Sequence, residues 1–140
     1  MNKTRTPKQV GEAWFGPMWN NRDIAMMREL MAPGAIGHLE GGREAVGPEG
    51  FAEFQAEFVR AVPDLKLEVM NSLADGDDVC VHWHATGTHT GDGLGIAPTD
   101  AKLDFQGVTW LRVQGGQIVE GWDFWNLGAV MQCMSGMATV

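Results

Sequence analysis

The stretch FQGVTWLRVQGGQIVEGWDFWN, residues 105–126, predicts two long strands joined by a tight hairpin. Apolar, aromatic and β-branched residues run along both halves of the stretch. Gly115-Gly116 between the halves has the composition of a two-residue hairpin turn. If Gln114 faces Gln117 across this turn, the two strands pair antiparallel from there outward. The remaining segments can then be placed around this hairpin.

The second strand of the hairpin carries a carboxylate in its interior, at Asp123. The simple register places Val108 opposite Asp123, and alternation then puts Gln106, Trp110 and Trp125 on the same face. Because strand interiors disfavour Asp, we expect Asp123 either to be paired or to line a cavity. In a cavity, poor solvation would raise the pKa of its carboxyl and make it a candidate general acid or base. The alternative is an exposed Asp on the open side of the sheet, paired with a cation.

The segments before the hairpin read as helices first and strands afterwards, which predicts an α+β fold. Three helices are expected, and their predicted starts are Thr6-Pro7, Asp23 and Gly47-Pro48. Gly16-Pro17 should kink or break the first helix. Strands are expected over residues 65–72 and 79–87, followed by a glycine-rich loop over 88–101. Three helices on one face of a curved antiparallel sheet would make a cone with a pocket inside.

Composition and charge exclude several classes of protein. The chain has 140 residues, which suits one domain, with 44% hydrophobic and 20% charged residues. Its net charge is −8 and its Lys and Arg residues form no cluster, which argues against nucleic acid and acidic membrane surfaces as partners. No apolar run approaches the roughly 20 residues of a membrane helix.

Cysteine usage and the N-terminal sequence suggest a compartment. Cys80 and Cys133 have no metal-ligand spacing around them, so we expect two free thiols. The first residues are not followed by an apolar signal region. We therefore expect a reduced, cytoplasmic protein.

A series of short Gly, Pro and Trp motifs follows one another in a characteristic order along the chain. They are Gly47-Pro48-Glu49-Gly50-Phe51, Pro63-Asp64-Leu65, Gly76-Asp77, Trp83, Gly87-Thr88-His89-Thr90-Gly91, Gly95-Ile96 with Pro98-Thr99, Gly107 with Arg112, and Gly116 to Asp123. Together they resemble the SnoaL-like polyketide cyclase family of the NTF2-like superfamily, over about residues 8–134 of a single domain spanning 1–140. The resemblance implies a cone of curved sheet that helices close over a deep pocket. It also implies a homodimer or higher homo-oligomer packed through the open sheet face.

The resemblance further implies a reaction. Cyclases of this family close a ring of an aromatic polyketide by an intramolecular aldol reaction, without a metal or organic cofactor, using an Asp of the final strand as general acid/base. Asp123 occupies the matching position. Because fold kinship does not determine chemistry, two alternatives to a cofactor-free lyase or isomerase stay open. One is a non-catalytic small-molecule binding protein, and the other is a dehydratase or hydrolase of the same superfamily.

Further residues are candidates for binding a small hydrophobic or aromatic ketone-like ligand. Gln106 would hold a substrate oxygen, unless it is a surface residue. Trp110 and Trp125 would form flat walls for a planar ligand, unless they serve core packing. His38 would polarise a carbonyl, whereas the alternative is an exposed loop histidine.

His82 and His84 form an i, i+2 pair on one face of a strand. If that face points inward, the pair would work with Asp123 on the substrate. If it points outward, the pair belongs to the surface or to a subunit interface. Their spacing also suits a metal, but a third ligand is not evident in the sequence.

Apolar residues on both faces of the sheet predict self-association. Phe105, Leu111, Trp122 and Phe124 are expected opposite the face of Asp123. Four large apolar side chains exposed together would make an unusually large patch for a monomer. We therefore expect a second copy of the chain to cover them.

Overall fold

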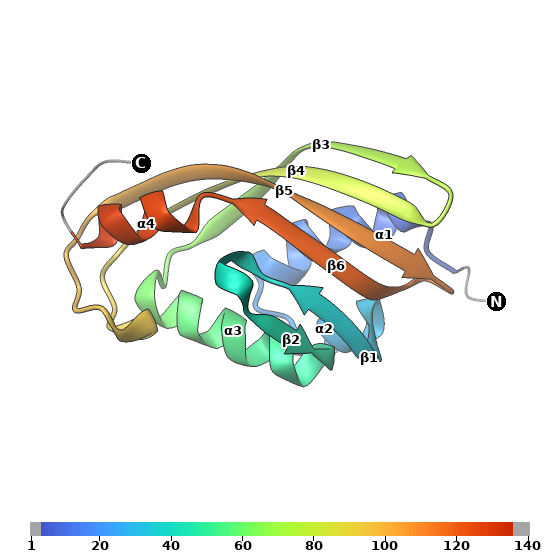
Figure 1. The fold of residues 1–140 in the computed structure, drawn as a ribbon, viewed down its shortest axis with the longest axis horizontal. Helices are drawn as coiled ribbons and strands as arrows, with labels where there is room; N and C mark the ends of the chain where they lie inside the picture. The colour runs from blue at the N-terminus through green and yellow to red at the C-terminus, as the bar shows by residue number, and fades with distance from the viewer. Residues whose placement is uncertain (1–3, 136–140) are drawn as a thin grey trace.

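Six strands form one curved sheet in the computed structural model, which describes residues 4–135 (Figure 1). The sheet order is β2-β1-β6-β5-β4-β3. The strands are β1 (Met31–His38), β2 (Glu44–Val46), β3 (Lys66–Asp75), β4 (Asp78–Thr88), β5 (Lys102–Gln114) and β6 (Gln117–Trp125). The helices are α1 (Pro7–Ala13), α2 (Ile24–Leu30), α3 (Gly47–Ala61) and α4 (Leu127–Met134). The expected α+β class is confirmed.

One pair of neighbouring strands departs from the expected antiparallel arrangement. β1 pairs parallel with β6, while the other neighbouring strands pair antiparallel. No hairpin turn joins β1 to β6, so no local connection constrains their relative direction. A strand contributed between α2 and α3 thus extends the sheet beyond the C-terminal hairpin.

The helix starts follow the expected capping chemistry. Thr6 caps α1 in a capping box, because Gln9 N donates to Thr6 Oγ1 (3.2 Å) and Thr6 N donates to Gln9 Oε1 (2.9 Å). The expected interruption at Gly16-Pro17 is a π-helical turn over Trp14–Met18. Proline supplies no N–H for a regular helical bond, and the wider turn accommodates it.

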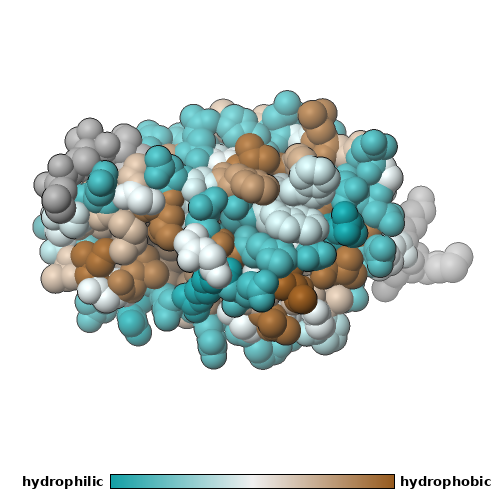
Figure 2. All heavy atoms as spheres, viewed as in Figure 1, coloured by the Kyte–Doolittle hydropathy of each residue, from teal (hydrophilic) through white to brown (hydrophobic). Residues whose placement is uncertain are grey.

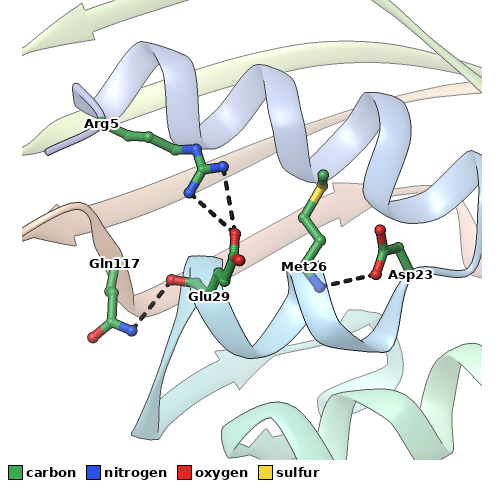
Figure 3. A network of polar contacts seen from close by, with 5 residues as sticks. All are labelled: Arg5, Asp23, Met26, Glu29 and Gln117. Carbon is green, nitrogen blue, oxygen red and sulfur yellow. Dashed lines mark hydrogen bonds and ion pairs between the residues drawn. The ribbon is translucent and has the colours of Figure 1, made fainter. Parts of the chain in front are cut away.

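A small polar network holds α2 against the hairpin (Figure 3). Asp23 caps the helix by accepting from Met26 N at 3.0 Å. Arg5 pairs with the Glu29 carboxylate at 3.5 Å, and Gln117 Nε2 donates to the Glu29 carbonyl oxygen at 3.2 Å. The end of α2 is therefore tied both to the chain before α1 and to the start of β6.

The helices cover one face of the sheet, which we call the inner face; the opposite face is the outer face. α1 contacts β3, β4 and β5, and α3 contacts β1 and β2. In Figure 1 the sheet arches from β3 at the top of the view to β2 near the bottom, with α3 along the lower side. The curved sheet and these helices enclose an apolar core. Within residues 4–135, no helix is long and apolar enough to cross a membrane.

Alternation along β4 follows the sequence expectation. Val79, Val81, Trp83 and Ala85 are buried on the inner face. Cys80, His82, His84 and Thr86 point the other way and are half-buried. The two histidines therefore lie on the outer face, which the sequence left undecided.

The expected pairing of Val108 with Asp123 is wrong. Gln114 does face Gln117, but the register shifts by one residue beyond Val113, where Val113 pairs with Ile118. Asp123 consequently pairs with Thr109. A single extra residue in one strand reverses the faces of all residues beyond it. The turn was therefore predicted correctly, but the faces of the residues beyond the shift were not.

The shift moves several residues to the face opposite the expected one. Gln106, Val108 and Trp110 lie on the outer face, away from Asp123. Phe105 and Leu111 were expected on the outer face, but both are buried on the inner face. Trp122 and Phe124 are on the outer face as expected.

Candidate functional site

An apolar pocket lies between the helices and the inner face of the sheet. Its empty space, counted out to the opening, is about 450 Å³. Most of its lining is aromatic: Trp14, Phe15, Trp19, Phe51, Phe54, Phe58, Trp83, Phe105 and Trp125, with Leu65, Leu67, Ala85 and Asp123 completing the wall. Among residues 4–135, Asp123 is the one ionisable side chain in this lining. The pocket therefore combines aromatic walls with a single acid or base.

A chain of hydrogen bonds holds the Asp123 carboxyl in place. The Thr109 hydroxyl donates to Asp123 Oδ1 at 2.8 Å. Thr109 Oγ1 in turn accepts from Trp83 Nε1 at 3.0 Å. Because the indole N–H occupies the hydroxyl oxygen, the hydroxyl proton is directed at the carboxylate. Among residues 4–135, the second carboxyl oxygen of Asp123 accepts no hydrogen bond.

Burial raises the pKa of Asp123 from 3.8 to about 6. The Thr109 hydrogen bond lowers this pKa and the negative charge of Glu40 raises it, but the burial effect is the largest. Asp123 is half-buried rather than fully buried, and it borders the pocket. Asp123 can therefore exchange a proton near neutral pH, which suits a general acid/base.

Glu40 approaches the site from the turn after β1. Its Oε1 accepts a hydrogen bond from Trp125 N at 3.1 Å. This contact fixes the last residue of β6, two positions beyond Asp123. Glu40 thus anchors a wall of the pocket and places a second negative charge near the carboxyl of Asp123.

The family described as SnoaL-like polyketide cyclase matches residues 12–133. The chain belongs to the SnoaL-like polyketide cyclase family. The match covers α2, α3 and the strand that carries Asp123. The expected family resemblance is confirmed.

Solved structures of similar proteins share the fold over nearly the whole chain. A candidate SnoaL-like polyketide cyclase from Jannaschia sp. CCS1 is 28% identical, with a TM-score of 0.84 over 96% of this chain and 98% of that chain. AclR, a candidate hydroxylase from Streptomyces galilaeus, is 26% identical, with a TM-score of 0.79 over 96% and 83%. A protein with a ketosteroid isomerase-like fold from Catenulispora acidiphila is 21% identical, with a TM-score of 0.76 over 96% of each chain, and shows the fold alone. No curated protein matches this chain.

Two of the sequence-derived site residues of this SnoaL-like protein meet in the pocket. Asp123 and Trp125 both line it. The Trp125 ring packs against Phe105, with centroids 5.4 Å apart, and edge-on against Phe58 at 6.0 Å. Trp125 therefore forms a wall of the pocket and also packs into its aromatic surroundings.

Gln106 and Trp110 do not reach the pocket. Gln106 Oε1 lies 2.7 Å from His82 Nε2 on the outer face. Trp110 is 43% exposed and donates from Nε1 to Asp78 at 3.1 Å. The register shift in β6 accounts for both differences.

The three histidine candidates make their polar contacts with residues other than Asp123, although His38 also lines a small second cavity that Asp123 borders. His84 Nε2 lies 2.6 Å from Asp104 Oδ1 on the outer face, and His82 pairs with Gln106. The His38 ring lies between two carboxylates, with Nε2 2.8 Å from Glu120 and Nδ1 3.1 Å from Glu44. Among residues 4–135, no group of three or more His, Cys, Asp or Glu side chains is placed to hold a metal ion.

Sequence reasoning missed several residues of the site. Thr109 was hidden by the incorrect register, because the simple pairing placed it on the face opposite Asp123. Trp19 follows the interruption at Pro17, where helical periodicity carries no signal. The Phe51, Phe54 and Phe58 stripe was visible as one face of a helix, and its spacing could have identified it as a pocket wall.

Proposed function

We propose that this SnoaL-like protein is a cofactor-free cyclase or isomerase acting on a small ketone- or polyketide-like substrate. Asp123 serves as general acid/base in a reaction of the intramolecular aldol type. The observation that carries this proposal is the pKa of about 6 at a carboxyl placed in an aromatic pocket. Family membership supports the reaction class.

The chemistry follows from the protonation state of Asp123. The ionised carboxyl removes a proton from the carbon beside a carbonyl, and the C–H electrons form an enolate. The enolate carbon attacks a second carbonyl of the same molecule, forming a C–C bond and an alkoxide. Asp123 returns its proton to the alkoxide, so the product is an isomer of the substrate. Thr109 keeps the carboxyl oriented through both transfers.

The pocket walls support a flat, hydrophobic substrate. Aromatic rings from the helices face aromatic rings of β4, β5 and β6 across the pocket. No Lys or Arg side chain of the described part of the chain, residues 4–135, lines it. Such walls favour an aromatic ketone over a phosphorylated or carboxylated substrate.

Proton abstraction can be measured without knowing the natural substrate. Exchange of the α-hydrogens of 1-tetralone into heavy water reports enolate formation. We expect the Asp123→Asn variant to stay folded and to exchange on the order of 10²- to 10⁴-fold more slowly than wild type. Asp104→Asn is the matched control, because that carboxylate lies on the outer face, and it should leave exchange unchanged.

Two results would contradict the enzymatic proposal. A folded Asp123→Asn variant with full exchange activity would show that Asp123 is not the base. Wild-type protein that binds the ketone and exchanges nothing would instead be a small-molecule binding protein on the same fold.

We also propose that the protein is a homodimer formed through the outer face. Five large apolar side chains on this face support the proposal: Leu73 (71% exposed), Phe124 (56%), Trp110 (43%) and Val108 (39%), with half-buried Trp122 beside them. Figure 2, in the view of Figure 1, shows hydrophobic residues scattered among hydrophilic ones on the side of the molecule that it draws. We also propose that the protein is cytoplasmic. The free thiols of Cys80 and Cys133 support this location.

A further inference from the structure

A second, smaller cavity adjoins the aromatic pocket at Asp123. Its empty space, counted out to its opening, is about 310 Å³, and the enclosed part has room for a methyl group rather than for a ring. Trp14, Phe51 and Asp123 line both this cavity and the pocket. Residues that belong to both linings mark the place where the two spaces meet. The proposed base therefore borders two compartments of different size.

The walls of the second cavity are mostly aliphatic, whereas those of the pocket are mostly aromatic. Beyond the shared residues, four buried and uncharged side chains make up much of its lining: Met31, Leu39, Leu111 and Ile118. An apolar group that moves from water into such surroundings gains free energy in proportion to the area it buries. The composition of this cavity therefore suits an alkyl group.

The polar side chains that line this cavity with Asp123 already have partners. The Thr109 hydroxyl donates to Asp123 and accepts from Trp83 Nε1. The His38 ring places both nitrogens against carboxylates and stacks on Trp122, an outer-face residue, with ring centroids 5.5 Å apart. Few polar groups are left for a water molecule, which favours an apolar occupant over a water.

Two neighbouring glycines leave this space open. Gly37 on β1 pairs with Gly121 on β6, and both line the cavity. The partner of Gly37 on its other side, Ala45, is buried on the inner face, so a side chain at Gly37 would point inward as well. In the described part of the chain, a Cβ on Gly37 would meet only the Ala45 carbonyl oxygen, at an ordinary 3.8 Å. A Cβ on Gly121 would come within 3.0 Å of Leu111 Cδ2, so Gly37 is the position where a methyl group fits.

We propose that the second cavity is a subsite for a short alkyl group on the reacting carbon of the substrate. The proposal rests on the function proposed above and narrows the substrate class to ketones that are alkylated at the carbon from which Asp123 takes the proton. A carbon held against Asp123 lies where the two spaces meet. Its aromatic part then occupies the pocket and its alkyl group the second cavity. Two seated groups also fix the direction of the remaining C–H bond toward the carboxylate.

Three related ketones locate the alkyl group. Binding of 1-tetralone, 2-methyl-1-tetralone and 6-methyl-1-tetralone is measured by calorimetry; the 2-methyl group is on the reacting carbon, and the 6-methyl group is on the aromatic ring. Wild type should bind the 2-methyl ketone about 4-fold more tightly than 1-tetralone, the gain from burying one added carbon. Wild-type protein that binds none of the ketones, or gains nothing from the 2-methyl group, would overturn the proposal.

Gly37→Ala tests whether the gain comes from the second cavity, because the added methyl group occupies the same space. The preference for the 2-methyl ketone over 1-tetralone should disappear in this variant. A general effect on the pocket acts on both ketones and cancels in their ratio, and the ratio of 6-methyl-1-tetralone to 1-tetralone should match wild type. Retention of the 2-methyl preference in Gly37→Ala would overturn the proposal.

Gly34→Ala is the matched control, since it adds the same methyl group to the same strand at an exposed position with nothing within 4 Å of the new Cβ. It should keep the wild-type preference, and its loss there would contradict the assignment to the second cavity.

A variant that enlarges the cavity should act in the opposite direction. Ile118→Val removes one methyl group from a buried lining residue. It should improve binding of 2-ethyl-1-tetralone relative to 2-methyl-1-tetralone by about 2- to 4-fold over wild type. An unchanged ratio would contradict the proposal. These binding ratios need no turnover, whereas α-hydrogen exchange that depends on Asp123 tests the reaction itself, so failure of the subsite and failure of the proposed function remain distinguishable.

Discussion

Among single residues, Asp123 couples the stability of the protein to pH. Its folded pKa of about 6 lies above its ordinary value of 3.8, so between these values the folded state holds a proton that the unfolded state has lost. The free energy of unfolding should therefore fall as pH rises from about 4 to about 6, by at most about 3 kcal/mol from this group. In Asp123→Asn this fall in the free energy of unfolding should be absent.

Urea unfolding of wild type and Asp123→Asn at pH 4 and pH 7.5 measures the effect. The two proteins should be similar at pH 4, and the variant should be the more stable at pH 7.5. Parallel pH dependence in the two proteins would contradict the raised pKa. Asp75→Asn, at an exposed position at the end of β3, should follow wild type.

Glu40 influences the same carboxyl from outside the pocket wall. Because its negative charge raises the pKa of Asp123, Glu40→Gln should lower that pKa. In the proposed reaction the ionised form is the base, so wild-type exchange should decline below pH about 6, and in Glu40→Gln this decline should move to lower pH.

The Glu40→Gln substitution keeps the pocket wall intact. The Gln side-chain oxygen can still accept from Trp125 N, so the end of β6 keeps its anchor. A profile of 1-tetralone exchange against pH tests the prediction, with the exposed Glu49→Gln as control. An unmoved profile in Glu40→Gln would show that the charge does not reach Asp123.

Among the elements, β5 contains Gly107, and its lack of a side chain lets Trp83 and Trp125 pack closely beside the pocket. A Cβ on Gly107 would collide with the ring of Trp83 and with Cβ of Trp125. Both side chains are packed on several neighbours, so neither can move freely. Gly107→Ala should therefore destabilise the protein by roughly 1–3 kcal/mol and weaken ligand binding.

A matched glycine on β1 provides the comparison. At Gly34 a Cβ would meet nothing within 4 Å, so Gly34→Ala should change stability little. Thermal or urea unfolding of both variants separates the close approach from the general effect of adding a methyl group. Equal stability of Gly107→Ala and wild type would mean that Trp83 and Trp125 can shift at little cost in free energy.

The whole molecule exposes an apolar outer face that a second copy should cover. Sedimentation at micromolar concentration should give twice the mass of the 15.2 kDa chain. Phe124→Lys, at a 56% exposed position, should shift the protein toward monomer without unfolding it. Val46→Lys, at a 59% exposed position on β2, is the control. A monomeric wild type would refute the dimer.

Several features of the whole fold were predictable because they are local. The Gly115-Gly116 turn and the Thr6-Pro7 helix start depend on residues next to one another, and both form as expected. The alternation of β4 follows from strand geometry alone. The family motifs likewise indicated the cone and the family.

The arrangement of the site was decided by contacts between distant segments. The one-residue shift in β6 placed Thr109 rather than Val108 opposite Asp123, and turned Gln106 and Trp110 outward. No feature of the hairpin sequence marks that shift, because it depends on how the whole sheet packs on its helices.

The amino-acid sequence by itself determined the strand that carries Asp123, the hairpin turn, the helix starts and the family. Only the tertiary structure decided that Asp123 meets Thr109, that Glu40 lies close by, and that Trp19 joins them from another element. The physical reason is that turns, caps and alternation depend on neighbours in the chain. The pKa of a carboxyl and the pairing of a buried N–H depend instead on groups that only folding brings together.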